Sequence, residues 1–163
     1  MSPTGELAAA PALRLDAPDQ HFAERVRASF ARQRAMDLVG ASLELVEIGR
    51  CTIRLPYRED LTQQHGYVHG GIVGMIADSA AGYAGMTLAA PEAGVLTVEY
   101  KLNLMAPAAG ESIVARGRVV RPGRTLVITQ ADVVAVRGDE ERHCATLLQT
   151  LMVVTGHAER DPD

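Results

Sequence analysis

The feature that most constrains the fold is a nearly uncharged stretch over residues 69–90, HGGIVGMIADSAAGYAGMTLAA. It is long enough for about five or six helical turns, and Asp78 is its only charged residue. A helix on a protein surface needs a polar face, and this one has none, so other elements must cover it. A membrane helix would fit the length and the small pair Gly70 and Gly74, but the many glycines, the central aspartate and the lack of a flanking basic cluster argue against it. We therefore expect a helix over residues 70–89 that a β-sheet encloses.

Asp78 is the anomaly in this helix. A lone carboxylate on a buried helix is costly unless it is paired, protonated or turned toward a cavity. Because such residues cluster at functional sites, Asp78 is a candidate for chemistry. The alternative is a structural hydrogen bond, for example across a dimer interface.

Composition narrows the class of protein. At 163 residues the chain fits one domain with its own core. A net charge of −4 and a pI near 5.7 argue against nucleic-acid binding, which favours a basic surplus. Cys51 and Cys144 lie far apart without metal-ligand spacing, so we expect two reduced core thiols rather than a disulfide or a zinc site. Since no basic segment followed by an apolar one marks a secretory signal, the expected compartment is the cytoplasm.

The chain divides into three segments: a lead-in rich in Ala and Pro (residues 1–18), one domain (residues 19–154) and a polar tail (residues 155–163). At the start of the domain, Phe22, Val26 and Phe30 recur at four-residue intervals, as on one face of a helix. Charged residues fill the remaining positions. This pattern predicts one outer helix over residues 19–37.

Alternating apolar and polar residues predict two short strands before the buried helix and four long strands after it. The predicted strands are residues 43–48 (through Leu43, Leu45 and Ile48), 51–55, 97–104, 111–121, 125–137 and 143–154. In the first long strand, Val98 and Tyr100 are expected on the buried face, with Thr97 on the other. Pro122 and Gly123 predict a type II turn in a later hairpin. Consecutive hairpins make an antiparallel sheet, which can curl around one helix, so the expected fold class is α+β.

The loop that leads into the helix carries a family resemblance. Residues 63–71 read QQHGYVHGG, and Asp78 follows about two turns into the helix. This combination resembles the signature of PaaI-type (phenylacetate-pathway-type) hotdog thioesterases, in which an Asn or Gln precedes G-x-x-H-G-G and an acidic residue follows. The matching positions are Gly66, His69, Gly70, Gly71, Asp78 and Thr97, with Gln63 where the family usually has Asn. The similarity spans residues 38–154 and implies a hotdog fold, an antiparallel sheet wrapped around one long buried central helix, with an N-terminal outer helix.

These residue types suit thioester hydrolysis, which needs a group that polarises the carbonyl and an activated water. Gly70 and Gly71 open the helix, where backbone N–H groups lack partners and the dipole is positive, so they can form an oxyanion hole. Asp78 can act as general base on water or attack directly to give a mixed anhydride, and the resemblance favours the base. Gln63 is expected to hold the carbonyl or the water, and Thr97 to orient the water. For Thr97 an ordinary strand position is the competing interpretation.

Four further residues are candidates for substrate binding. Gly66 and His69 lie in the loop before the helix, where His69 can instead serve to tie down the loop. Arg121 and Arg124 flank a tight turn and can meet the phosphates of coenzyme A. A solvated hairpin tip is the competing interpretation of the two arginines. No metal or other cofactor is expected.

The resemblance implies an acyl-CoA thioesterase that releases a free acid and coenzyme A. It also implies a homodimer or a dimer of dimers with sites at the subunit interface. The alternative is a non-catalytic hotdog module that binds acyl-CoA as a sensor, but such sensors usually carry a DNA-binding region, and the helix over residues 19–37 has no partner helix. Neither nucleic acid nor a membrane is an expected partner. Because the chain has no Trp, two Phe and four Tyr, an aliphatic acyl pocket is favoured over an aromatic one.

Overall fold

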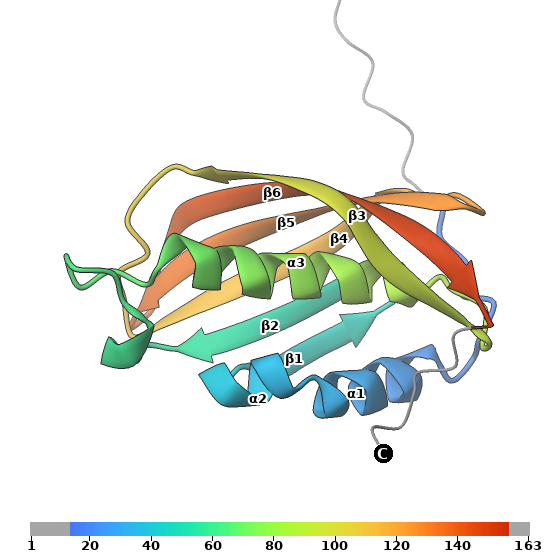
Figure 1. Cartoon of the computed structure of the whole chain (residues 1–163), viewed down its shortest axis with the longest axis horizontal. Coiled ribbons are helices and arrows are strands. Elements are labelled where there is room, and N and C mark those ends of the chain that lie inside the picture. The colour runs from blue at the N-terminus through green and yellow to red at the C-terminus, as the bar shows by residue number, and fades with distance from the viewer. Residues whose placement is uncertain (1–13, 157–163) are drawn as a thin grey trace, which may run out of the picture.

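In residues 14–156, the part of the chain that the computed structural model describes, six antiparallel strands form one sheet that curls around a long helix (Figure 1). The strands are β1 (Ser42–Glu47), β2 (Arg50–Pro56), β3 (Ala93–Leu104), β4 (Ser112–Arg121), β5 (Leu126–Arg137) and β6 (Glu140–Thr155). Their order in the sheet is β1-β2-β4-β5-β6-β3. A 3-10 turn, η1 (Glu59–Leu61), lies in the loop before the long helix. The predicted α+β architecture, an antiparallel sheet around a buried helix, is therefore confirmed.

The enclosed helix α3 (Gly70–Met86) is apolar around most of its surface. It packs tightly on the sheet: a Cβ atom added to Gly117 in β4 would lie 2.2 Å from the carbonyl oxygen of Ala80. The helix is shorter than the predicted 70–89. Its last turn is closed by the buried Thr87 hydroxyl, which donates to a main-chain carbonyl 2.7 Å away.

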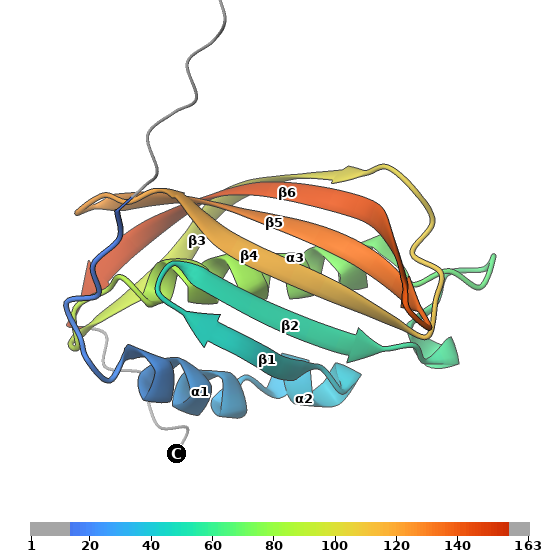
Figure 2. The ribbon, with the colours of Figure 1, turned by 180° about the vertical axis from the view of Figure 1, so that it is seen from behind.

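The predicted outer helix is two helices, α1 (Phe22–Arg32) and α2 (Arg34–Val39), with Gln33 between them in a non-helical conformation. Figure 2 shows both helices running alongside β1. The break has a packing reason, because an unbroken helix would turn Met36 about 120° away from Phe30, whereas Met36 is in fact fully buried. The continuous helix of the sequence prediction is thus corrected to two, while its place outside the sheet is confirmed.

A β-bulge in β1 changes which of its side chains face the core. The register against β2 shifts between Leu43 and Leu45. As a result, Leu43 and Val46 pack against the core, and Leu45 is 38% exposed. The even alternation predicted through Leu45 and Ile48 is wrong, because a bulge adds one residue to one strand and reverses the faces beyond it.

Strand β3 forms one edge of the sheet and carries a second bulge. Its register against β6 shifts around Val98, which is the additional residue. Thr97 and Tyr100 therefore both point toward α3, where Thr97 reaches Asp78 and the Tyr100 hydroxyl approaches Gly74. The prediction that placed Thr97 opposite Tyr100 and buried Val98 is wrong, since Val98 is 58% exposed.

The hairpin between β4 and β5 forms as predicted, but its turn is not of type II. Gly123 lacks the positive φ angle that a type II turn requires at this position. Glycine is needed there for space, because a Cβ atom would lie 2.1 Å from the carbonyl oxygen of Leu126. In the last hairpin β6 begins at Glu140, earlier than the predicted residue 143, where it pairs with Arg137.

Cys51 and Cys144 are both buried free thiols, as predicted. No helix within residues 14–156 is long and apolar enough to cross a membrane. The predicted lead-in and tail lie largely outside the described residues. Of the lead-in, Leu15 packs against a small apolar cluster that contains Val119.

Candidate active site

The carboxylate of Asp78 on α3 faces two strands of the sheet. Its Oδ1 accepts a hydrogen bond of 2.8 Å from Thr97 Oγ1 in β3 and another from Gln149 Nε2 in β6. The same nitrogen lies 2.7 Å from Thr97 Oγ1 and donates to it. Gln149 Oε1 accepts in turn from Thr129 Oγ1 in β5, at 3.0 Å. This network fixes Asp78 through Oδ1, whereas Oδ2 has no hydrogen bond to the described part of the chain.

Sequence reasoning missed Gln149 and Thr129. Gln149 is only 1% exposed, and it stands in β6 between Leu147 and Leu151, both of which are buried. The signal was present in the sequence, because an amide at the apolar positions of a strand has to find hydrogen-bond partners in the core. The identity of that partner, however, depends on how β6 lies against α3.

Burial dominates the electrostatics of the carboxylate. It raises the pKa of Asp78 above the ordinary value, and the hydrogen bonds from Thr97 and Gln149 offset part of that rise. A carboxylate with a raised pKa is a better proton acceptor. Asp78 is thus both fixed in position and strengthened as a base.

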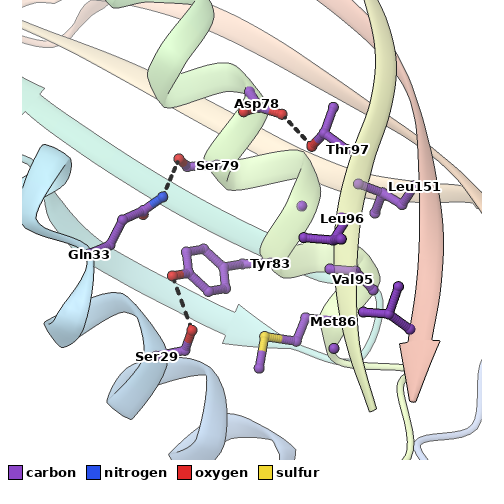
Figure 3. A pocket seen from close by; sticks show the side chains of 13 residues that line it. Ser29, Gln33, Asp78, Ser79, Tyr83, Met86, Val95, Leu96, Thr97 and Leu151 are labelled. Atoms are coloured by element: carbon purple, nitrogen blue, oxygen red, sulfur yellow. Dashed lines mark hydrogen bonds between the residues drawn. The ribbon is translucent and has the colours of Figure 1, made fainter. Parts of the chain in front are cut away.

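A cavity of about 380 Å³ opens beside Asp78 (Figure 3). One wall is a single face of α3, where residues 78, 79, 82, 83 and 86 recur at helical spacing. Ser29 and Gln33 from α1 and its end form a second wall, and the start of β3 with the end of β6 forms a third. A largely apolar cavity with a few converging polar groups is typical of a substrate pocket.

The start of α3 has one backbone amide already engaged. His69 Nδ1 accepts from the Gly71 N–H at 2.9 Å and so caps the helix. The N–H of Gly70 makes no hydrogen bond to the residues that the structure describes. Of the two amides expected to form the oxyanion hole, Gly71 is therefore engaged within the chain and Gly70 is open, and the His69 side chain ties the loop to the start of the helix.

Gln63 lies in the loop before α3, and a hydrogen bond fixes the orientation of its side-chain amide. The side-chain oxygen of Gln63 accepts from the His65 N–H, which leaves its NH₂ group to donate. Gln63 and Gly70 line a second cavity of about 370 Å³. Gly66 has a φ of +78° and its N–H donates to the Gln63 carbonyl at 2.9 Å. The turn thus requires glycine at position 66 whether or not this residue meets substrate.

The predicted catalytic residues fall into two groups within one chain. Gly70 and Gln63 lie at the start of α3, and Asp78 and Thr97 lie farther along it. At the helical rise, Gly70 and Asp78 are about 12 Å apart along the axis. An oxyanion donor must lie about 3 Å from the oxygen it stabilises. One chain alone therefore does not bring the two groups to the same carbonyl.

The two arginines lie away from both groups. Arg124 lines a third cavity of about 520 Å³ together with Arg14 and with Gly85, near the C-terminal end of α3. Arg121 is exposed at the end of β4. Within one chain neither arginine lines the cavity beside Asp78 or the one beside Gln63.

Comparison with known proteins identifies the fold and the family of this chain. Residues 65–141 match the thioesterase superfamily. A solved thioesterase family protein from Silicibacter pomeroyi is similar with a TM-score of 0.81 and 48% identity, over 83% of this chain and 99% of that chain. The PaaI protein of E. coli, from the phenylacetic acid degradation operon, shares the fold with a TM-score of 0.76 at 15% identity, over 85% of this chain and 97% of its own.

A protein of Saccharolobus solfataricus that bears the name of an esterase is 31% identical over 122 residues, 75% of this chain and 79% of its own length. The chain also matches a second protein of that organism that bears the name of an esterase, and it spans 61% of the length of that protein. The sheet that encloses α3 and the similarity to thioesterases identify a hotdog-fold thioester hydrolase. The chain belongs to the thioesterase superfamily, and its likeness to PaaI-type hotdog thioesterases is confirmed.

Proposed function

We propose that this thioesterase hydrolyses acyl-CoA thioesters to a free carboxylic acid and coenzyme A. One observation carries the proposal: Asp78 is held through Oδ1 by Thr97 and Gln149 while its Oδ2 stays unbonded among the described residues, beside a cavity. A carboxylate fixed through one oxygen keeps the other for a water molecule.

In the proposed reaction Asp78 is the general base. Its Oδ2 takes a proton from water as the water oxygen attacks the thioester carbonyl carbon. The carbon–sulfur bond then breaks, and the coenzyme A thiolate leaves and takes up the proton. The raised pKa of Asp78 supports the base role, and Thr97 orients the water. No metal or other cofactor enters these steps.

The proposed oxyanion donors lie at the start of α3. The Gly70 N–H lies where the helix dipole is positive, and the NH₂ group of Gln63 is left to donate because its oxygen is engaged by His65. His69 contributes by capping the helix and fixing the loop. Both donors line the same cavity, which supports their acting on one carbonyl oxygen.

We further propose that each active site is shared by two chains. The separation between Gly70 and Asp78 within a chain is one reason. The other is β3, a sheet-edge strand along which large apolar side chains, among them Val98 and Tyr100, are half exposed or more. Such an edge favours pairing with a second copy. A two-fold pairing of β3 edges would place Gly70 of one chain near Asp78 of the other and create two equivalent sites.

Arg121 and Arg124 are proposed to meet the phosphates of coenzyme A from either chain. A dimer of dimers is compatible with the same shared site. The two free buried thiols support the cytoplasm as the compartment, because disulfides are rare there.

A panel of acyl-CoA thioesters of graded length, assayed by thiol release, tests the proposed function. We expect hydrolysis that declines once the acyl group exceeds the cavity. The two cysteines of the enzyme will not disturb the assay, because both are buried and burial raises the pKa of Cys51 to about 12. Binding of acyl-CoA without thiol release would contradict the proposal and favour the sensor alternative.

A further inference from the structure

Two cavities follow one another along α3. One, of about 380 Å³, lies beside Asp78, and a second one of about 520 Å³, the terminal cavity, lies near the C-terminal end of the helix. Asp78 and Gly82 line the first cavity. Gly85 lines the terminal cavity. Because helix positions three and four apart share a face, these three residues form one stripe that runs from the first cavity to the second.

Strand β6 passes the two cavities in the same order. Gln149 holds the carboxylate of Asp78. Leu151 lies at the wall of the cavity beside Asp78 (Figure 3), and Val153 lines the terminal cavity. Alternate residues of a strand share a face and lie about 7 Å apart. The inner face of β6 therefore leads from the carboxylate through Leu151 to the terminal cavity.

The Leu151 side chain lies between the linings of the two cavities. It packs so closely on α3 that a Cβ atom added to Gly85 would lie 2.4 Å from Leu151 Cδ1. It also belongs to a small apolar cluster with Val127, against which Leu88 and Val153 pack. All three of these neighbours line the terminal cavity. Leu151 thus has the cavity beside Asp78 on one side and the lining of the terminal cavity on the other.

We propose that Leu151 is a specificity-determining residue that ends the acyl pocket and limits the length of the acyl chain. This inference rests on the proposed thioesterase function and on the cavity beside Asp78 as the acyl pocket. With the thioester carbonyl at Asp78, the acyl chain extends along α3 toward Gly85, seven residues further on, or about 10 Å at the helical rise. Leu151 blocks the chain there. The preferred substrates are thioesters with short or medium-length acyl groups, to which the terminal cavity stays closed.

The test compares kcat/KM for hexanoyl-CoA and dodecanoyl-CoA. We expect the wild-type enzyme to favour hexanoyl-CoA, because the longer chain cannot pass Leu151. Leu151→Ala should open the passage and raise the dodecanoyl-to-hexanoyl ratio by about tenfold, as expected for the burial of roughly two further methylene groups. The matched control is Leu148→Ala, on the other face of the same strand and 50% exposed, which should leave the ratio unchanged.

A second substitution shows where the longer chain lies. Val153→Phe adds an aromatic ring to the lining of the terminal cavity. In the Leu151→Ala background it should cancel the gain for dodecanoyl-CoA. In the wild-type background, where Leu151 still separates the cavities, it should not change the ratio. If Leu151→Ala does not fold, Leu151→Val replaces it, because the smaller truncation leaves a smaller void and shifts the ratio in the same direction.

Three results would overturn the inference while leaving the thioesterase proposal in place. These are a wild-type enzyme that hydrolyses dodecanoyl-CoA as well as hexanoyl-CoA, an unchanged ratio in the folded Leu151 variant, or a gain that survives Val153→Phe. Failure to hydrolyse any thioester would overturn the proposed function instead.

Discussion

Gln149 and Asp78 form a hydrogen bond that ties β6, the strand between β5 and β3, to the carboxylate on α3. The amide of Gln149 also donates to Thr97, and its oxygen is held by Thr129. Two strands beneath the helix thus determine where the carboxylate points. Gln149 does not contact the proposed water, so we regard it as a positioning residue that acts through Asp78.

The variant Gln149→Leu should shift the pH dependence of hydrolysis. The hydrogen bond from Gln149 lowers the pKa of Asp78, so its loss raises that pKa further. The acidic limb of the kcat/KM profile should move to higher pH, and kcat should fall about tenfold. Gln130→Leu, a change on β5 where the side chain bonds to Arg118, serves as control. A loss of activity with an unmoved acidic limb would contradict the positioning role.

Substitution at Gly82 tests the cavity as the acyl pocket. Gly82→Ala meets no neighbour and removes a helical glycine, so the free energy of unfolding should rise by about 0.5–1 kcal/mol. Gly82→Leu should lower kcat/KM more for hexanoyl-CoA than for acetyl-CoA. Thermal unfolding and the acyl-CoA panel measure the two effects.

The contrasting variant is Gly117→Ala. Its new Cβ atom would lie 2.2 Å from the carbonyl oxygen of Ala80, so it should destabilise the fold by about 1–3 kcal/mol or more. If Gly82→Leu affected acetyl-CoA and hexanoyl-CoA equally, the acyl group would not occupy this cavity.

Mixed dimers test whether the active site is shared. Gln63→Ala and Asp78→Asn chains, each inactive alone, should recover activity when they are co-refolded in equal amounts. About half of the dimers are then mixed, and each mixed dimer has one intact site, so activity should reach roughly a quarter of the wild-type level. The matched control pairs Asp78→Asn with Thr97→Val, whose lesions fall in the same half of the site and should give no recovery. No recovery in the first mixture, with subunit exchange verified, would refute the shared site.

The outline of the fold could be predicted because it depends on patterns of apolar and polar residues that extend over whole helices and strands. A helix without a polar face has to be enclosed, and consecutive hairpins supply the sheet that encloses it. The contact between Asp78 and Thr97 also agrees with the family motif, which places both residues at the site. The hotdog architecture thus followed from the segment around α3 and the strands after it.

What the sequence did not reveal depends on packing at single residues. The bulge at Val98 turns Thr97 toward α3, and no alternation pattern announces it. The break at Gln33 arises because Met36 must reach the core. The engagement of the Gly71 amide by His69 depends on a side-chain rotamer. These details nevertheless decide which amide is open and which side chains line the cavity.

The variant Asp78→Asn should change stability in a pH-dependent way. Because the pKa of Asp78 is raised in the folded protein, the folded state binds the proton more tightly than the unfolded state does. The stabilisation from that proton is complete below the ordinary value of 3.8 and is lost as pH rises through the raised pKa. The variant should therefore have a higher Tm than the wild type at neutral pH, with the difference closing toward acidic pH. A lower Tm at neutral pH would indicate a structural role for the carboxylate.

The turnover number of Asp78→Asn is the most direct measurement of the proposed chemistry. The assay uses an acyl-CoA thioester that the wild-type enzyme hydrolyses, with Asp139→Asn, in the exposed turn before β6, as control. We expect kcat to fall about 100-fold or more in a folded variant, because the amide cannot take the proton from water, and to stay at the wild-type level in the control. A wild-type kcat in Asp78→Asn would contradict the assignment of this residue as the general base.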